Sequence, residues 1–297
     1  MAERVVVVGV DGSSESMDAV VWASREALRR GCRLRIVNAW HPHAYAVSPF
    51  FVVAVPEAMG EPEETARTNA EKACELAQRV VPRLDVQLRT PCGPSARTLL
   101  EHAADAQVLV IGGKHRSALD RAVFGSVTTH AVTHAPCPVV VVRAQAADSG
   151  RAVEGRGPVV LGFDGSDGAR TAAVFAFEYA EDHGLDVSVV LAVNHALRDD
   201  LAGGDQMLEL NPQCLADSMS DFAGKYPTVV MTATTAVGYP ASVLLDHAQR
   251  AELLVVGSRG RGWFEGMLLG SVSGALVHHA PVTLAVVHER NASADLG

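Results

Sequence analysis

The chain has 297 residues, of which 48% are apolar and 20% are charged, and its formal net charge is −9. This composition is typical of a globular protein, and the chain is long enough for one large or two ordinary domains. Lysine and arginine are scattered along the chain, so nucleic-acid binding and attraction to an anionic membrane, which need clustered positive charge, are not expected.

The N-terminal half alternates short Val/Ile/Leu runs with longer helical patterns. The runs predict strands near 5–10, 33–39, 84–89, 107–112 and 138–142, and the patterns predict helices near 14–30, 62–81, 95–105 and 125–135. Strands this uniformly apolar are typical of a parallel sheet that helices cover on both faces. Five such strands with four helices between them predict a doubly wound α/β domain, whose ligands bind at the carboxyl ends of the strands.

Several features indicate where the protein works. The first strand begins at residue 5 and leaves no room for a signal peptide. The five cysteines are odd in number and far apart, without a CxxC pair, and the histidines lack partners at metal-ligand spacing. We therefore expect a soluble cytoplasmic protein without disulfides or a metal site.

The longest apolar stretch, residues 44–59, is interrupted by Pro49 and Pro56 and is too short to span a bilayer. It has no apolar counterpart in the second half of the chain, where residues 194–212 are polar. Two interpretations stay open: a loop folded over its own domain, or a contact surface that serves self-association or covers a pocket as a lid.

The second half of the chain repeats the first. Three pairs of blocks match: 5–16 with 158–169, 99–113 with 244–258, and 125–142 with 270–287. Residues 144–157, between the copies, are polar and contain Gly and Ala, which is typical of a linker. The sequence therefore predicts two homologous domains, residues 1–144 and 157–290.

Both copies carry Asp-Gly-Ser directly after their first strand, at residues 11–13 and 164–166. One interpretation is a tight turn followed by a serine N-cap of the next helix. The other is contact with a polar ligand, which the recurrence of the motif at the carboxyl end of a strand favours.

A sharper pattern is Gly257-x2-Gly260-x9-Gly270-Ser271, which begins at the end of the fourth strand and closes where a helix begins. Glycines permit positive φ and let backbone N–H groups approach an anion, and a helix N-terminus adds unpaired N–H groups. The pattern predicts phosphate binding, and the alternative is a flexible Gly-rich loop. It is neither a Walker A loop nor a GxGxxG fingerprint.

The aspartate after the first strand, the glycine loop after the fourth, and HAP before a Val-rich fifth strand together resemble the universal stress protein family. The resemblance covers both copies, so the chain resembles a tandem universal stress protein. It implies two Rossmann-like five-stranded parallel sheets of order 3-2-1-4-5, of the adenine nucleotide alpha hydrolase-like kind. It also implies that the domains pair through their fifth strands, here 138–142 and 282–287.

In the family members that bind nucleotide, ATP lies between the first and fourth strands, and the resemblance carries its contacts to this chain. Asp164 would approach the ribose, Ala192 would offer its backbone to adenine, and Gly257 and Gly260 would line the ribose and phosphates. The β- and γ-phosphates would be held by Gly270, Ser271, Val272 and Ser273. The matching residues of the first copy are Asp11, Ala39, Gly112, Gly125, Ser126, Val127 and Thr128.

The first copy departs from the pattern at His115, which stands where the second copy has Gly260. A non-Gly residue in a left-handed conformation costs about 1–2 kcal/mol, and a Cβ could also push the phosphates away. Lys114, His115 and Arg116 bring positive charge to the loop in compensation. We therefore expect the second site to bind ATP more strongly than the first.

The resemblance implies a stress-response regulator that acts by binding ATP, with any Mg²⁺ carried on the phosphates. The loop has no carboxylate clearly placed to activate a water, so hydrolysis should be slow if it occurs. Two alternatives stay open: a scaffold that binds no nucleotide, and an adenylating or ATP-hydrolysing enzyme of a related α/β class. The sequence identifies neither the regulatory protein partner nor whether two chains form a homodimer.

Overall fold

A computed structural model of the chain describes residues 4–42, 47–48, 51–52, 62–113, 125–143, 157–193, 212–260 and 269–288. The chain divides into two compact units, Met1–Val142 and Arg143–Gly297, and each unit is described by itself. The predicted pairing of the two domains through residues 138–142 and 282–287 stays a prediction.

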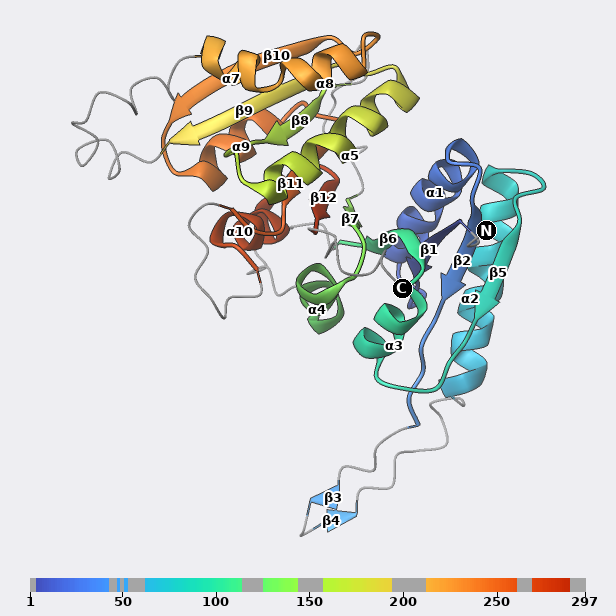
Figure 1. The fold of residues 1–297 in the computed structure, drawn as a ribbon. Coiled ribbons are helices and arrows are strands. Elements are labelled where there is room, and N and C mark those ends of the chain that lie inside the picture. Colours follow the sequence, from blue (N-terminus) through green and yellow to red (C-terminus); the bar gives the residue numbers. More distant parts are fainter. Residues whose placement is uncertain are drawn as a thin grey trace, which may run out of the picture. The chain divides into compact units, whose positions relative to one another are not determined.

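The first domain is built on a five-stranded parallel sheet (Figure 1). Its strands are β1 (Val5–Gly9), β2 (Arg33–Val37), β5 (Val86–Arg89), β6 (Ala106–Gly112) and β7 (Val139–Val142). They lie in the order β5-β2-β1-β6-β7, and every neighbouring pair is parallel. The helices are α1 (Ser14–Arg29), α2 (Pro62–Val80), α3 (Ser95–His102) and α4 (Ser126–His134). The predicted order 3-2-1-4-5 is confirmed.

The second domain repeats this plan. Its strands are β8 (Val159–Gly162), β9 (Val187–Val193), β10 (Met231–Val237), β11 (Leu253–Gly257) and β12 (Leu284–Val287), in the order β10-β9-β8-β11-β12. Its helices are α5 (Asp167–His183), α7 (Pro212–Ser218), α8 (Ser220–Lys225), α9 (Pro240–Ala248) and α10 (Ser271–His279). Two short helices, α7 and α8, thus take the place that α2 has in the first domain.

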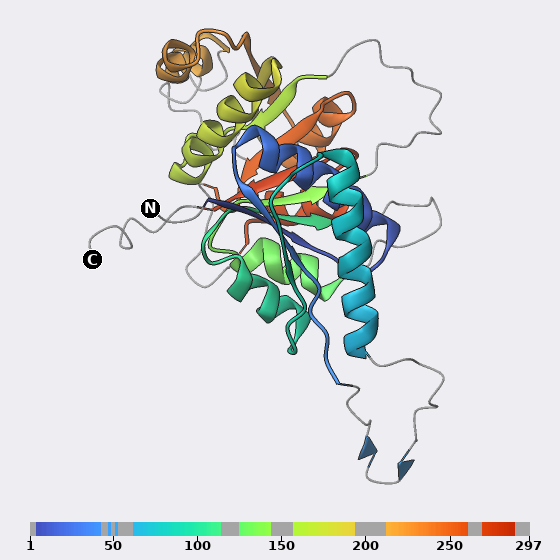
Figure 2. The same cartoon turned by 90° about the vertical axis from the view of Figure 1, so that its right-hand side faces the viewer.

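The two layers of helices around each sheet follow from the residues that face it. All four valines of β1 are fully buried, because helices cover both faces of the sheet. In α1 the sheet-facing positions are small residues, Ala19, Ala23 and Ala27, which recur every four residues and let the helix lie close to the strands. Helix α1 packs beside α2 on one face, and α3 packs beside α4 on the other (Figures 1 and 2).

This division of helices places the candidate site. The chain leaves β1 toward one face and leaves β6 toward the other, so the connections diverge at the carboxyl ends of these neighbouring strands. In doubly wound folds a ligand binds in the crevice at such a point. The same reversal occurs between β8 and β11 in the second domain.

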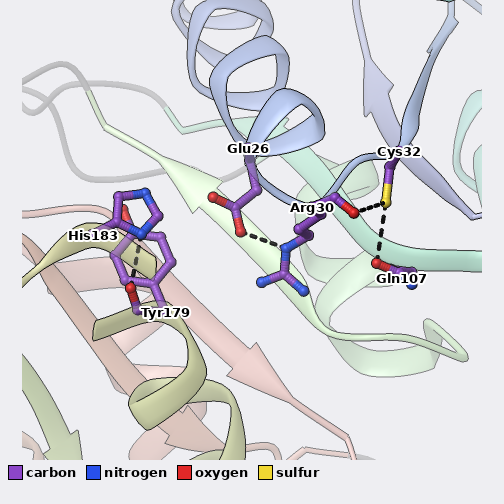
Figure 3. A network of polar contacts seen from close by, with 6 residues as sticks. All are labelled: Glu26, Arg30, Cys32, Gln107, Tyr179 and His183. Carbon is purple, nitrogen blue, oxygen red and sulfur yellow. Dashed lines mark hydrogen bonds and ion pairs between the residues drawn. The ribbon is translucent and has the colours of Figure 1, made fainter. Parts of the chain in front are cut away.

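Away from the carboxyl ends of the strands, polar side chains hold the ends of helices in place. Figure 3 shows two such places, at the ends of α1 and α5. In the first domain, Arg30 Nε donates to Glu26 Oε1, and Cys32 Sγ donates to Gln107 Oε1 at 3.2 Å. Burial raises the pKa of the Cys32 thiol, which keeps the sulfur protonated and able to donate. None of the five cysteines, all of which lie in the described part of the chain, forms a disulfide. In the second domain, the Tyr179 and His183 rings stack with centroids 3.8 Å apart.

Within the apolar segment 44–59, the described residues form two short antiparallel strands, β3 (Val47–Ser48) and β4 (Phe51–Val52). The remainder of that segment lies outside the described residues, so its two interpretations stay open. No helix in the described part of the chain is both long enough and apolar enough to cross a membrane.

Candidate functional site

The Asp-Gly-Ser turn after β8 is held by its own side chains. Asp164 Oδ1 accepts hydrogen bonds from the Ser166 N–H at 3.0 Å and from its hydroxyl at 2.6 Å. Ser166 Oγ in turn accepts from the N–H of Ala169 at 3.2 Å and caps α5. Gly165 has φ +78°, in the left-handed region that favours glycine. The motif is therefore a turn and N-cap that also fixes the Asp164 carboxylate.

The second oxygen of Asp164 faces the glycine loop after β11. A Cβ added to Gly260 would collide with Asp164 Oδ2. Since Oδ1 is held by two hydrogen bonds from Ser166, displacement of the carboxylate would strain those bonds. The fold thus brings Asp164 and Gly260 into contact, although they are far apart in the sequence.

This contact corrects the reason expected for Gly260. Gly260 does not have positive φ, so backbone conformation does not require glycine there. Glycine is favoured there because the loop backbone lies directly against the Asp164 carboxylate, so that a Cβ would displace it. His115, its counterpart, lies outside the described residues, as do Lys114 and Arg116.

Gly257 and Gly112 are also required by close packing. A Cβ on Gly257 would stand 2.8 Å from the carbonyl carbon of Gly168, in the first turn of α5. A Cβ on Gly112 would stand 2.8 Å from the backbone nitrogen of Ser16, in the first turn of α1. In each domain the start of the glycine loop is therefore pressed against the helix that follows the Asp-Gly-Ser turn.

In the second domain, the far end of the loop is tied back to its beginning. The N–H of Gly270 donates to the carbonyl oxygen of Ser258 at 2.9 Å. Ser273 is 2% exposed, and its hydroxyl shares its single proton between the same oxygen at 2.9 Å and the Gly270 carbonyl oxygen at 3.0 Å. Ser273 thus uses its hydroxyl to position the loop, a role that the sequence did not reveal.

The N-terminus of α10 lies at this closed end of the loop. Gly270 is its N-cap, and among the described residues no side chain caps its first turn. Such a turn offers unpaired N–H groups and partial positive charge to an anion. Ser271 and Val272 supply two of these N–H groups. The hydrogen bond from Gly270 to Ser258 ties this helix end to the beginning of the loop that contacts Asp164.

The first domain has the same turn but a different loop closure. The Ser13 N–H and hydroxyl donate to Asp11 Oδ1 at 3.0 and 2.5 Å, and Gly12 has φ +86°. Burial opposes ionisation, but these bonds and one from Ser16 outweigh it and hold the pKa of Asp11 below its usual value. Asn69 of α2 also donates to the carbonyl oxygen of Asp11 at 3.3 Å, a contact that nothing in the sequence signalled.

At the N-terminus of α4, Gly125 has open space where a Cβ would stand. Within the described part of this domain, no hydrogen bond ties Gly125 to Gly113, and Thr128 makes no bond like that of Ser273. Ser126 and Val127 begin α4 as Ser271 and Val272 begin α10. The base-end candidates, Ala39 just beyond β2 and Ala192 within β9, are both half-buried.

These features define a class of protein: a doubly wound α/β domain, present twice, with an aspartate turn after the first strand and a glycine loop after the fourth. The sequence model of the Universal stress protein family matches residues 3–143 and 155–288. The chain belongs to the universal stress protein family and carries two tandem copies of its domain.

Similar proteins agree with this assignment over the whole chain. A universal stress protein of Mycolicibacterium smegmatis is 34% identical in an alignment of 300 residues that covers 97% of this chain and 98% of that protein. One from Mycobacterium tuberculosis is 33% identical over 293 residues, covering 96% and 97%. A crystal structure of a universal stress protein from Archaeoglobus fulgidus shares the fold, with a TM-score of 0.69 at 15% identity over 96% of this chain and 98% of that one.

Proposed function

We propose that this universal stress protein binds ATP at the carboxyl edge of its second sheet and acts as a stress-response regulator by binding rather than by catalysis. The observation that carries the proposal is the contact of Gly260 with Asp164 Oδ2. It places a carboxylate, which can accept hydrogen bonds from a ribose, against a loop that ends at the uncapped N-terminus of α10. Ribose and phosphates of one nucleotide would then be held by neighbouring strands.

Any Mg²⁺ at this site would come with the nucleotide. Within the described ranges, no group of three or more His, Cys, Asp or Glu side chains could hold a metal ion. Mg²⁺ characteristically binds through substrate phosphates and few protein groups, so any Mg²⁺ would enter with ATP. A regulatory protein partner would read the nucleotide-dependent surface, and association of two chains into a homodimer is a separate proposal.

The first test is to denature freshly purified protein and to quantify the released nucleotides by chromatography, followed by calorimetric titration with Mg-ATP. The Gly260→Glu variant would place a second carboxylate beside Asp164 and the phosphates, and we expect it to weaken binding at least about tenfold. Gly224→Glu is the charge-matched control, because Gly224 lies in α8 with open space around it. This control should bind as the wild type does.

Three outcomes would contradict the proposal. Absence of binding at millimolar Mg-ATP would favour the nucleotide-free scaffold. Unchanged binding in Gly260→Glu would remove ATP from the second site. Sustained release of pyrophosphate or phosphate from ATP would contradict action by binding alone and would favour an enzyme of the related α/β class.

A further inference from the structure

Asn38 occupies the base end of the first domain's site. It directly follows β2 and precedes Ala39, the residue expected to meet adenine. Val10 N–H donates to the carbonyl oxygen of Val37 at 2.9 Å, and Asn38 N–H donates to that of Arg89 at 3.0 Å. Asn38 is therefore fixed between the carboxyl ends of β1 and β5, one residue beyond the regular ladder.

The side chain of Asn38 is buried, and its amide donor is unused. The residue is 6% exposed, and among the described residues nothing accepts a hydrogen bond from Nδ2. In folded proteins roughly 90% or more of buried polar groups are paired, because an unpaired one is destabilising. A buried donor without an acceptor is thus an exception. Because Nδ2 itself has almost no accessible surface, a ligand can accept from it only when the Asn38 side chain turns toward the crevice.

The direction of this side chain follows from the alternation along β2. Arg35 points to the face of α3, where it contacts Asp105 and the His102 carbonyl. The ladder with β5 continues past Val37 through the bridge of Trp40 to Cys92, so the alternation holds at Asn38. Asn38 therefore faces the side of α1 and α2, where Asn69 reaches the Asp11 turn.

At the matching position of the second sheet, which lies within the described residues, there is no such donor. Val190 pairs with Gly162 as Val37 pairs with Gly9, so the residue at the register of Asn38 is Leu191. Leu191 is half-buried and pairs with Thr235 of β10. At this position the two domains thus differ by one hydrogen-bond donor, although the strands that carry it have the same register.

We propose that Asn38 Nδ2 donates a hydrogen bond to a ring nitrogen of a purine nucleotide bound at the first domain, so that this site selects its base by a contact that the second site lacks. The inference rests on the proposed nucleotide binding and extends it to the first domain. Asn38 is then a specificity-determining residue. Leu191 has no donor, so it makes no hydrogen bond to the same ring nitrogen in the second site.

The test uses the full-length Gly260→Glu chain, in which binding at the second site is weakened, and it follows the binding that remains. Calorimetric titrations compare ATP with its 1-deaza, 3-deaza and 7-deaza analogues, each of which lacks one ring-nitrogen acceptor. We expect one analogue to bind about tenfold more weakly than ATP, the size of a single net hydrogen bond. In Gly260→Glu/Asn38→Leu, which copies the residue of the second domain, all four nucleotides should bind alike.

Each other outcome overturns the inference. Equal binding of all four nucleotides to Gly260→Glu would show that no ring nitrogen is read, whether or not Asn38→Leu folds. Discrimination that persists in Asn38→Leu, or in Asn38→Ala as a second variant, would assign it to another residue. If Gly260→Glu binds no nucleotide while the wild type does, the inference fails and the second-domain function stands; if the wild type binds none, the proposed function fails as well.

Discussion

The two domains share the beginning of the glycine loop and differ at its end. Gly112 and Gly257 both press against the first turn of a helix, so the frame of the site is the same in both copies. In the second domain, Gly270 and Ser273 are tied to Ser258, whereas Gly125 has open space around it. A duplicated fold can therefore keep the packing that its sheet demands while the closure of a binding loop changes independently.

Substitution of the two shared glycines should produce the largest effect. We expect Gly257→Ala and Gly112→Ala each to lower the free energy of unfolding of their domain by about 1–3 kcal/mol, because the new methyl group meets helix backbone that cannot rotate away. Chemical denaturation followed by circular dichroism measures this. Gly125→Ala is the control and should stay within about 0.5 kcal/mol. Equal losses in all three variants would break the distinction between the two ends of the loop.

Most of the fold could be predicted from the sequence because its signals are local. The buried valine runs and the alanine stripes have the periods of strands and helices, and the repeat supports the elements in its three matched blocks twice. The positions of the site glycines could also be predicted, from the spacing of the glycines in the sequence. The short strands β3 and β4 were not predicted, since a two-residue ladder leaves no period to detect.

The reasons behind the site were harder to foresee than its positions. Positive φ was expected in the glycine loop, but at Gly260 the requirement is contact with Asp164, which only the folded chain brings near. The Asn69 bond to the Asp11 carbonyl and the Ser273 bond to the Ser258 carbonyl join backbone oxygens to distant side chains. Carbonyl oxygens carry no residue-specific pattern, so sequence alone gives no sign of such bonds.

Removal of the Ser273 hydroxyl tests whether the end of the glycine loop is held more firmly in the second domain than in the first. We expect Ser273→Ala to lower the stability of the second domain by about 1 kcal/mol, since the one proton that the hydroxyl shares between two loop carbonyls is lost. Thr128→Ala, the matched change in the first domain, should stay below about 0.5 kcal/mol. Hydrogen exchange of the α10 and α4 amides measures each domain separately. Equal acceleration of exchange in both helices would contradict the asymmetry.

The smallest expected effect concerns the Asp11 turn. Because the pKa of Asp11 is lower in the folded domain than in the unfolded chain, its carboxylate stabilises the fold above the unfolded pKa of about 3.9. This stabilisation is lost as the pH falls through the folded value. We therefore expect the stability difference between wild type and Asp11→Asn to be constant from about pH 7 to 5 and to shrink below about pH 4.

The difference should not exceed about 0.5 kcal/mol, because Asp11 is exposed and solvent screens its interactions. Urea denaturation across this pH range measures it. Ser13→Ala serves as the background control: it removes the hydroxyl that donates to Asp11 Oδ1, so Asp11→Asn should then add less pH dependence. A difference that grows as the pH falls would mean that the carboxylate destabilises the turn. The Asp-Gly-Ser motif of the first domain would then hold its charge for a ligand, at the expense of the local fold.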